Sequence, residues 1–510
     1  MKLAELIKGL PIEPIRGSVS AEITGIAEDS RRATAQCLFA ARSGLQTDGL
    51  DFVGDAVAAG ASAVLVPHGA TVDVPETITV LTAPDVAALL GPLAERLWSR
   101  PSEALRLVGV TGTNGKTTVS HLIHHILDTS GLRCGLIGTV RIDDGTRDQK
   151  ATVTTMSSMT TPPAVDISPT LATMVAHDCL AAVLEVSSHA LHQQRTAGLA
   201  FDVGVFTNLS GDHLDYHDTL DAYADAKAML FRSLPATGYA VINIDDPASS
   251  RMIADCAAQP LTCSLTDRRA ECFAEIGRQT ISRVEAIFHG PWGSFEVRLP
   301  LAGTHNVINA LQAAGTGFVL GIGRATLQSA LDGCTAPPGR LESVTGPDDP
   351  FTVLVDYAHT DAALENVLRT LRPLVPHDGR LRVVFGAGGD RDRTKRPRMG
   401  RVAAEIADEL IITSDNPRTE APAAIMDEIA SGVPDIRWPK TSLRADRREA
   451  IEAAIEVSRP GDVVLIAGRG HEAYQIIGTE RRPFDDRIVA RQAIASRRQA
   501  IPVPTQAGRP

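Results

Sequence analysis

Apolar residues follow two patterns along this chain. Short, mainly apolar runs such as 105–110 and 463–466 have the length of buried strands. In residues 119–127 the apolar positions recur at helical spacing, and this stripe ends before Gly131, a natural helix C-cap. Strands and helices of this kind alternate along the chain, which predicts an α/β protein with parallel sheets.

The length of 510 residues predicts about three domains. Residues 1–104 alternate short strands with helices and form the expected N-terminal α/β domain. Residues 105–336 are expected to form a central P-loop domain with a parallel sheet, and a Pro-Pro-Gly linker begins the expected Rossmann-like domain, 337–499. The segment 500–510 has three prolines and little apolar content, which predicts a mobile tail.

One stretch of the central domain is polar and rich in strand-forming residues. It covers residues 262–299 and contains a Gly290-Pro291 turn. We therefore expect an antiparallel edge on the central sheet.

A glycine-rich motif, TGTNGKTT at residues 111–118, lies between a predicted strand and a predicted helix. In such a loop, backbone N–H groups bind phosphate oxygens, Lys116 reaches the β and γ phosphates, and Thr117 binds Mg²⁺. The usual pattern has a glycine where this chain has Val110, so a chance Gly-Lys-Thr turn is the alternative. The strand and helix on either side favour nucleotide binding. The predicted ATP-binding residues of the loop are Gly112, Thr113, Asn114, Gly115, Lys116, Thr117 and Thr118.

Three further residues of the central domain are candidates for metal or phosphate chemistry. Glu185 ends a buried strand, where a second Mg²⁺ ligand is expected, although a capping or salt-bridged glutamate has the same pattern. His213 could bind a metal while Asp212 or Asp215 orients its ring; the alternative is a surface histidine beside a helix cap. Lys227 lies in a predicted helix, and its spacing alone favours a solvated lysine.

Four apolar runs of the third domain each end in a polar motif. Polar residues at the carboxyl ends of parallel strands mark the ligand crevice of open α/β sheets. The third domain is therefore expected to carry a site of its own. The motifs are DYAH at 356–359, GAGGDR at 386–391, SDNPR at 414–418 and GRGHE at 468–472.

Composition limits the class of partner and the compartment. Hydrophobic residues make up 44% and charged residues 22%, which is typical of a soluble globular protein. The net charge of −11 argues against nucleic acid or an anionic membrane as main partner, and no apolar run approaches the roughly 20 residues that span a bilayer. The seven cysteines lack CxxC spacing, which argues against a disulfide framework or a zinc site and favours the cytoplasm.

Together these motifs resemble the Mur ligase family, the ATP-dependent amide ligases that build the peptide of peptidoglycan precursors in the bacterial cytoplasm. Residues 111–118 resemble its ATP loop, 185–189 its metal-binding strand end, and 212–215 its magnesium histidine segment. The resemblance implies that Lys227 is carbamylated to N6-carboxylysine and binds a second Mg²⁺. It implies the catalytic residues Lys116, Glu185, His213 and Lys227, the metal ligands Thr117, Glu185, His213 and Lys227, and the adenine-side contacts Asn306 and Asn309.

Within the family the likeness is strongest to the members that add diaminopimelate. Three groups of residues support this assignment: Asp29-Ser30-Arg31 in the first domain, the dipeptide residues of the central domain named below, and the DNPR motif at 415–418. The residues implied for UDP-muramoyl dipeptide are Ser30, Thr160, Thr161, Ser187, Gln193 and Arg195. Those implied for diaminopimelate are Arg391, Asp415, Asn416, Pro417, Arg418, Gly468 and Glu472.

The chemistry of meso-diaminopimelate suits this last set. It carries two carboxylates and two ammonium groups, so its site needs guanidinium groups and a carboxylate. Arg391, Arg418 and Glu472 supply them, and a lysine-adding relative would not need Arg418. The implied reaction is phosphorylation of the D-glutamyl γ-carboxylate by ATP and attack of the amine on the acyl phosphate. His359 and Asp356 are weak candidates for the base.

Three alternatives remain. A lysine-adding ligase of the same family differs only in the amino-acid site. A folylpolyglutamate synthetase-like ligase shares the ATP loop and the carbamylated lysine, but the first domain argues against it. A nucleotide-dependent switch would not need Arg391, Arg418 and Glu472. The resemblance also implies a role in cell-wall synthesis, cell shape and division, with ATP and Mg²⁺, small-molecule substrates, no nucleic acid, no membrane insertion and a monomeric state.

Overall fold

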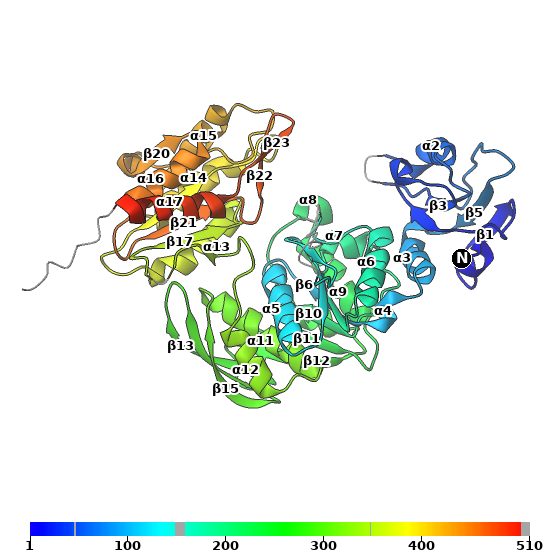
Figure 1. Cartoon of the computed structure of the whole chain (residues 1–510), viewed down its shortest axis with the longest axis horizontal. Coiled ribbons are helices and arrows are strands. Elements are labelled where there is room, and N and C mark those ends of the chain that lie inside the picture. The colour runs from blue at the N-terminus through cyan, green and yellow to red at the C-terminus, as the bar shows by residue number, and fades with distance from the viewer. Residues whose placement is uncertain (45–46, 148–158, 347, 501–510) are drawn as a thin grey trace, which may run out of the picture. The chain divides into compact units, whose positions relative to one another are not determined.

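The computed structural model describes residues 1–44, 47–147, 159–346 and 348–500, and it contains three large α/β sheets (Figure 1). Contacts group the chain into two units. The first comprises Met1–Ala274, Phe288–Phe295 and Ile308–Leu331, and the remainder forms the second. The predicted α/β class with parallel sheets is confirmed. The boundaries at 104/105 and 336/337 stay predictions, and residues 501–510 of the expected tail lie outside the described residues.

The N-terminal sheet has five strands in the order β1-β5-β4-β3-β2, of which only β1 is antiparallel to its neighbour. Alternate side chains enter two cores: Leu65 lies in a cluster with α3, and Val64 in a cluster with α2. The elements are α1 (Leu3–Ile7), β1 (Glu13–Arg16), β2 (Gly25–Ala27), η1 (Ser30–Arg32), β3 (Cys37–Ala40), η2 (Gly49–Phe52), α2 (Val53–Ala58), β4 (Ala63–Pro67), β5 (Thr79–Ala83), α3 (Val86–Leu97) and α4 (Pro101–Ala104).

The central sheet places β6, the strand before the glycine-rich loop, between β9 and β10, both parallel to it. Helix α5 packs on β9, β7 and β6, while α6 and α9 contribute to a separate core with Leu107, Leu184 and Phe206. The elements are β6 (Arg106–Thr111), α5 (Lys116–Thr129), β7 (Cys134–Ile137), β8 (Ile142–Asp143), α6 (Ala164–Ala176), β9 (Ala181–Glu185), α7 (Ser188–His192), β10 (Val203–Phe206), α8 (Leu214–His217), α9 (Leu220–Arg232), β11 (Tyr239–Asn243), α10 (Ser249–Ile253) and β12 (Gln259–Ser264).

The edge of this sheet differs from the prediction. Strand β12 pairs with β11 in parallel, because helix α10 carries the chain back to the start of the sheet, and β13 pairs with β12 in parallel at Cys263 and Cys272. The expected antiparallel edge is therefore wrong for these strands. The predicted turn is present, since β14 ends at Gly290 and β15 begins at Gly293. The elements that follow β12 are β13 (Cys272–Gln279), β14 (Val284–Gly290), β15 (Gly293–Leu299), α11 (Thr304–Val319) and α12 (Arg324–Asp332).

The C-terminal sheet has the order β16-β17-β21-β18-β19-β20, with only β16 antiparallel. Its side chains alternate: Val383 and Leu465 pack with α13–α15, while Val384 and Ile466 pack with α16 and α17. Covering both faces explains why the inner strands of this sheet are mainly apolar, with apolar side chains on both faces.

The four predicted strand ends lie on neighbouring strands, because β21 is inserted between β17 and β18. The elements are β16 (Glu342–Ser343), β17 (Thr352–Asp356), α13 (Asp361–Leu371), η3 (Arg372–Leu374), β18 (Leu381–Phe385), α14 (Lys395–Ile406), β19 (Glu409–Thr413), α15 (Pro422–Ala430), η4 (Asp435–Lys440), β20 (Thr441–Arg444), α16 (Arg447–Glu456), β21 (Val463–Ala467), β22 (Tyr474–Ile477), β23 (Glu480–Pro483) and α17 (Asp486–Ala500).

Two global features bear on the expected class. All seven cysteines are free thiols. Among the helices of the described ranges, none combines the length and the apolar character needed to cross a bilayer.

Candidate functional site

The glycine-rich loop joins the end of β6 to the start of α5. Its backbone is left-handed at Gly115, with φ of +85°, and reaches +148° at Gly112. A Cβ on Gly112 would lie 1.9 Å from Thr207 Oγ1, and one on Gly115 would lie 2.7 Å from Asn309 Oδ1. Glycine is required at both positions because the loop lies directly against β10 and α11.

Hydrogen bonds hold this loop to the end of β10. Asn208 accepts the Thr113 N–H at its carbonyl (2.8 Å) and the Asn114 N–H at its side-chain oxygen (3.0 Å). Thr207 Oγ1 donates to the Asn114 carbonyl at 2.6 Å. Neither Thr207 nor Asn208 was predicted from the sequence to belong to the site. Their position directly after an apolar strand was the signal that could have found them.

Two lysines converge on one carbonyl of the loop. Lys116 Nζ donates to the carbonyls of Gly112 (2.9 Å) and Thr113 (3.0 Å), and Lys227 Nζ donates to Gly112 at 2.9 Å. Lys227 is only 1% exposed, so the solvated lysine favoured by spacing is wrong. Burial, together with the charge of Lys116, lowers the pKa of Lys227 well below 10.5. The site therefore favours a neutral amine at Lys227.

Glu185 is 1% exposed and lies beside the first turn of α5. Its carboxylate accepts hydrogen bonds from Thr117 Oγ1 (3.0 Å), Thr139 Oγ1 (2.9 Å) and Thr139 N–H (3.0 Å). The structure thus brings Thr117 and Glu185 together, as the metal hypothesis requires. Sequence reasoning missed Thr139, whose signal is its place in the Gly-Thr pair after strand β7.

The donor set at this point suits Mg²⁺ bound together with a nucleotide. Mg²⁺ prefers oxygen ligands and is usually held by one or two carboxylates, water and substrate phosphates. Thr117 and Glu185 supply a hydroxyl and a carboxylate 3.0 Å apart. In the part of the chain that the structure describes, no group of three His, Cys, Asp or Glu side chains could hold a metal alone. Water and substrate phosphate oxygens are the groups that usually complete such a coordination shell.

His213 lies in a cluster of aromatic rings. Its backbone is left-handed, with φ of +54°, its side chain is 48% exposed, and its Nε2 is 3.6 Å from Asp212. The side chain of Asp215 lies outside the described residues. The assignment of His213 as a metal ligand stays a prediction. The rings around it belong to His189, His192, Tyr216, His217 and Tyr223.

Four of the residues implied for the muramoyl dipeptide lie together around the short helix α7, which Ser187 precedes and Gln193 follows. Thr161 Oγ1 accepts the N–H of Ser187 at 3.0 Å, and Arg195 Nη1 donates to the carbonyl of Thr161 at 2.9 Å. Gln193 Oε1 accepts from Arg195 Nη2 at 2.6 Å. Thr160 is linked to this set through Thr139: its hydroxyl oxygen lies 3.0 Å from the Thr139 hydroxyl, which donates its proton to Glu185.

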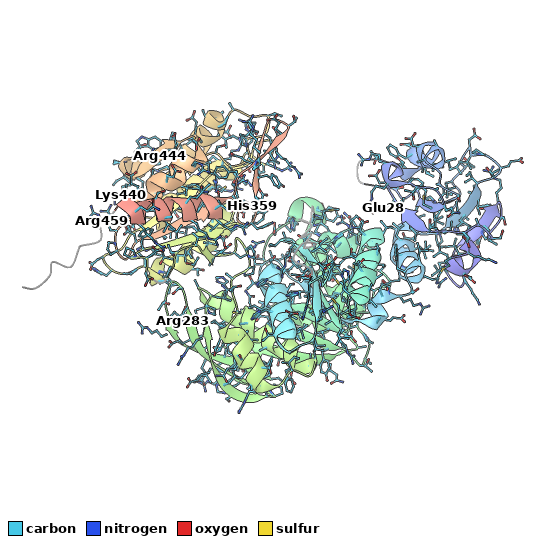
Figure 2. The ribbon with its side chains drawn as sticks, viewed as in Figure 1. Glu28, Arg283, His359, Lys440, Arg444 and Arg459 are labelled. Carbon is cyan, nitrogen blue, oxygen red and sulfur yellow. The ribbon has the colours of Figure 1, made fainter. Side chains whose placement is uncertain are left out.

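The N-terminal sheet carries Ser30, which is buried at the start of η1. Asp29 caps this turn by accepting the N–H of Arg31 at 3.0 Å. Nearby, Glu28 (labelled in Figure 2) forms an ion pair with Arg42, and both charges act on Arg195. Ser30 therefore belongs to the same region of the first unit as the dipeptide candidates.

The two asparagines of α11 have different surroundings. Asn309 faces Gly115 of the loop, because a Cβ added to Gly115 would lie 2.7 Å from Asn309 Oδ1. Asn306 donates from Nδ2 to the carbonyl of Ala302 at 2.8 Å. Asn309 therefore lies next to the nucleotide loop.

The DNPR motif after β19 contacts the motif after β21. Asn416 Nδ2 donates to Glu472 at 3.0 Å, and Asn416 Oδ1 accepts from Arg469 Nη1 at 2.9 Å. Burial raises the pKa of Glu472. Asp415 is buried, and its Oδ2 accepts no hydrogen bond from the described residues. That oxygen lies 2.6 Å from where a Cβ of Gly468 would be, so a side chain at Gly468 would cover it.

The arginines of the predicted set flank the loop after β18. Arg418 Nη1 donates to the carbonyl of Gly389 at 2.7 Å, and a Cβ on Gly388 would lie 3.0 Å from Arg418 Nη1 and 3.7 Å from Arg391 Cγ. The carbonyl of Pro417 is 1.9 Å from where a Cβ of Gly389 would be. The seven residues implied for diaminopimelate thus come from three adjoining strand ends.

The two candidate bases differ in their surroundings. Asp356 is buried and accepts hydrogen bonds from the N–H groups of Leu341 (2.7 Å) and Ala358 (2.8 Å). Its carboxylate is therefore already hydrogen-bonded to the backbone. His359 is exposed in the loop between β17 and α13 (Figure 2), and its Nδ1 lies 2.9 Å from the carbonyl of Tyr357. Because a carbonyl only accepts, Nδ1 carries the proton, and Nε2 of the neutral ring is an acceptor. His359 is the better placed base.

Known protein families and individual proteins match this chain along nearly its whole length. The "Mur ligase family, catalytic domain" matches residues 22–98, the "Mur ligase middle domain" matches 110–317, and the "Mur ligase, glutamate ligase domain" matches 339–470. A protein of Synechococcus elongatus named UDP-N-acetylmuramoyl-L-alanyl-D-glutamate--2,6-diaminopimelate ligase is 42% identical over 98% of this chain and 100% of its own length. A relative of the same name from Chlorobaculum tepidum is 43% identical over 92% of this chain and 91% of its own length.

Solved structures give the same result. A structure titled with that ligase name is 34% identical, covers 98% of this chain and 99% of its own, and superposes with a TM-score of 0.70. A Mycobacterium tuberculosis folylpolyglutamate synthase is 20% identical over 75% of this chain and 92% of its own, with a TM-score of 0.58, and this likeness shows the fold alone. The homologues are ATP-dependent amide ligases. Matches at these levels of identity and coverage show that this chain belongs to the Mur ligase family of such ligases.

Proposed function

We propose that this protein joins meso-2,6-diaminopimelate to the D-glutamyl γ-carboxylate of UDP-N-acetylmuramoyl-L-alanyl-D-glutamate, using ATP, in peptidoglycan precursor synthesis. The names of relatives about 42% identical over nearly the whole chain support this activity. The observation that carries it is the 3.0 Å hydrogen bond between Asn416 and Glu472, which joins two motifs more than 50 residues apart that we assign to the amino-acid site.

The charges of this site favour diaminopimelate over lysine. Arg391 and Arg418 lie beside Gly388, and a guanidinium group is suited to binding a carboxylate. Glu472 and the unpaired oxygen of Asp415 supply acceptors for an ammonium group. L-lysine has a single carboxylate, so one guanidinium would be left without a partner.

The first step transfers the γ-phosphoryl group of ATP to the substrate carboxylate. Loop N–H groups hold the phosphates, and Lys116 leaves the carbonyls of Gly112 and Thr113 to bind them. Mg²⁺ held by Thr117 and Glu185 neutralises phosphate charge when it is bound. The carboxylate oxygen forms a bond to phosphorus, ADP leaves, and the resulting acyl phosphate has a competent leaving group.

Lys227 is the proposed site of carbamylation. A neutral lysine amine adds to the carbon of CO₂ and loses a proton, which yields N6-carboxylysine with a negative charge. The lowered pKa of Lys227 supplies the neutral amine, and the burial of its side chain next to Gly112 places the new carboxylate beside the loop. His213 would complete the set of metal ligands.

The second step forms the amide. The amine of diaminopimelate attacks the acyl carbon, the C–O bond to phosphate breaks, and the nitrogen loses a proton to His359 Nε2. UDP-muramoyl dipeptide is held by Ser30, Thr160, Thr161, Ser187, Gln193 and Arg195. Asn306 and Asn309 contact the adenine side of ATP.

The same proposal places a monomeric enzyme in the cytoplasm, acting on small molecules and on neither nucleic acid nor membrane. The net charge of −11 and the predicted reducing compartment support it.

A paired amino-acid assay tests this function. Release of ADP is measured with UDP-muramoyl dipeptide and either meso-diaminopimelate, L-lysine or no amino acid. We expect release to require both substrates, with kcat/KM for meso-diaminopimelate at least about 100-fold above that for lysine. Equal use of lysine would favour the lysine-adding ligase, and rapid ADP release without an amino acid would favour a switch. Lys116→Ala, which lacks the phosphate-binding ammonium, is the inactive control.

A further inference from the structure

A fully buried ion pair lies directly behind the proposed amino-acid site. Arg447 is the first residue of α16 and Asp486 the first residue of α17, and both side chains are 0% exposed. Arg447 Nε donates to Asp486 Oδ1 at 2.8 Å and Nη2 to Oδ2 at 2.7 Å. This bidentate geometry fixes the orientation of the guanidinium group.

The remaining donors of Arg447 reach two strand ends. Nη2 donates to the carbonyl of Ala467 at 3.0 Å, and Nη1 to the carbonyl of Ser414 at 3.3 Å. Ala467 ends β21, and Ser414 follows β19; the sheet order places β18 between these strands. One side chain therefore links two strand ends that share no ladder of backbone hydrogen bonds.

Both linked carbonyls directly precede proposed substrate contacts. Ser414 is followed by Asp415 and Asn416, and Ala467 is followed by Gly468. The charge of Arg447 also acts on Asp415 and Glu472. A shift of the Arg447 guanidinium group would thus change the distance between the motifs at 415–418 and 468–472. It would also change the electrostatic potential at the carboxylates of Asp415 and Glu472.

Stability alone is a poor reason for such a pair. Burying two charges costs desolvation free energy, and well-packed apolar residues of similar volume are often at least as stable. A positional role explains why Arg447 contacts both strand ends.

We propose that Arg447, oriented by Asp486, is a positioning residue that sets the distance between the motifs at 415–418 and 468–472 and thereby the selection of the amino acid. This inference rests on the proposed function. Lysine cannot replace Arg447 in this role, because a single ammonium group lacks the planar fork needed to reach Asp486 and both carbonyls together.

The chain offers a matched control at the opposite end of the same strands. Arg382, near the start of β18, forms an ion pair with Asp462, which directly precedes β21. Their side chains are 3% and 2% exposed, so this pair is also buried. Arg382→Lys also removes a buried guanidinium group from this sheet. It leaves unchanged the carboxyl ends of the strands, where the proposed amino-acid site lies.

The test compares Arg447→Lys with Arg382→Lys in the full-length protein. We expect the KM for meso-diaminopimelate to rise at least about tenfold in Arg447→Lys, since small misplacements of binding groups have large effects. The KM for ATP should change less than about twofold, because no ATP contact is altered. Arg382→Lys should lower the thermal unfolding midpoint while the KM for meso-diaminopimelate stays at the wild-type value.

Several results would overturn the inference. Equal KM values for meso-diaminopimelate in the two variants, or a parallel rise of the KM for ATP, would mean that Arg447 serves general stability. If Arg447→Lys does not fold, the apolar pair Arg447→Met with Asp486→Leu takes its place, and the same rise of KM is expected. Failure of both to fold would assign the pair to stability alone. If wild-type protein released no ADP in response to meso-diaminopimelate, that result would instead contradict the proposed function.

Discussion

At the scale of single residues, the surroundings strongly change the chemistry of Lys227. Its helix places it against the nucleotide loop, where its Nζ donates to the carbonyl of Gly112 at 2.9 Å. Burial and the neighbouring charge of Lys116 lower the pKa of Lys227. The amine is thereby prepared for reaction with CO₂, because only a neutral amine is a nucleophile.

This lowered pKa predicts a pH-dependent stability difference between wild type and Lys227→Met. Between the folded-state pKa and 10.5, the unfolded lysine binds a proton that the folded lysine does not, so the free energy of unfolding rises with pH. In CO₂-free buffer, wild type should gain up to about 1.4 kcal/mol per pH unit relative to Lys227→Met. Urea unfolding of both proteins between about pH 7.5 and 9.5 measures the difference.

Other titrating groups are common to both proteins and largely cancel in that difference. A constant difference across the pH range would show that Lys227 remains charged in the folded protein. Repeating the series with added bicarbonate should increase the advantage of wild type, since carbamylation of the folded lysine adds a binding free energy.

At the scale of elements, the conformation of the glycine-rich loop between β6 and α5 depends on the adjacent strand β10. Gly112 has φ of +148°, and Thr207 Oγ1 occupies the space that its side chain would need. The loop therefore keeps its shape only while β10 lies beside β6.

We predict that Gly112→Ala disrupts nucleotide binding. The added Cβ would meet Thr207 Oγ1 at 1.9 Å, so the loop or the end of β10 must move. The Kd for ATP should rise at least about tenfold, as measured by calorimetry or fluorescence titration, because the loop N–H groups no longer converge.

Gly131→Ala is the matched control. Gly131 has φ of +87°, and a Cβ added there would have no atom within 4 Å, so the substitution introduces backbone strain of order 1–3 kcal/mol without a clash. An equal loss of ATP affinity in both variants would contradict the role assigned to the contact with Thr207.

At the scale of the whole molecule, the two proposed sites lie on different parts of the chain. The nucleotide loop, Glu185 and Lys227 belong to the first unit, and the motifs at 415–418 and 468–472 belong to the second. We therefore expect ATP and the amino acid to be bound by residues of different units. Substitutions in one unit should affect one substrate selectively.

Arg418→Ala tests this division. Removing the guanidinium leaves one substrate carboxylate without its partner, so the KM for meso-diaminopimelate should rise at least about 100-fold, while the Kd for ATP stays unchanged. Steady-state kinetics and ATP titration measure the two effects. An unchanged KM for meso-diaminopimelate would remove Arg418 from the site, and a comparable loss of ATP binding would contradict the division.

Sequence patterns predicted the local chemistry well where it depends on neighbouring residues. The loop at 111–118 and the strand end at Glu185 lie where the spacing places them, and Thr117 meets Glu185. Residues whose role depends on distant contacts escaped prediction. Arg447 and Asp486 are far apart in the chain, and Asn208 acts partly through its backbone carbonyl, so no local pattern marks them.

The sequence by itself determined the strand, loop and helix around the nucleotide motif and the polar residues that end each apolar run. Only the tertiary structure decided which of these ends meet. Insertion of β21 between β17 and β18 brings Glu472 to Asn416, and the packing of α9 buries Lys227 against Gly112. The physical reason is that apolar periodicity records which face of an element is buried, whereas strand order and side-chain partners depend on packing between segments remote in the chain.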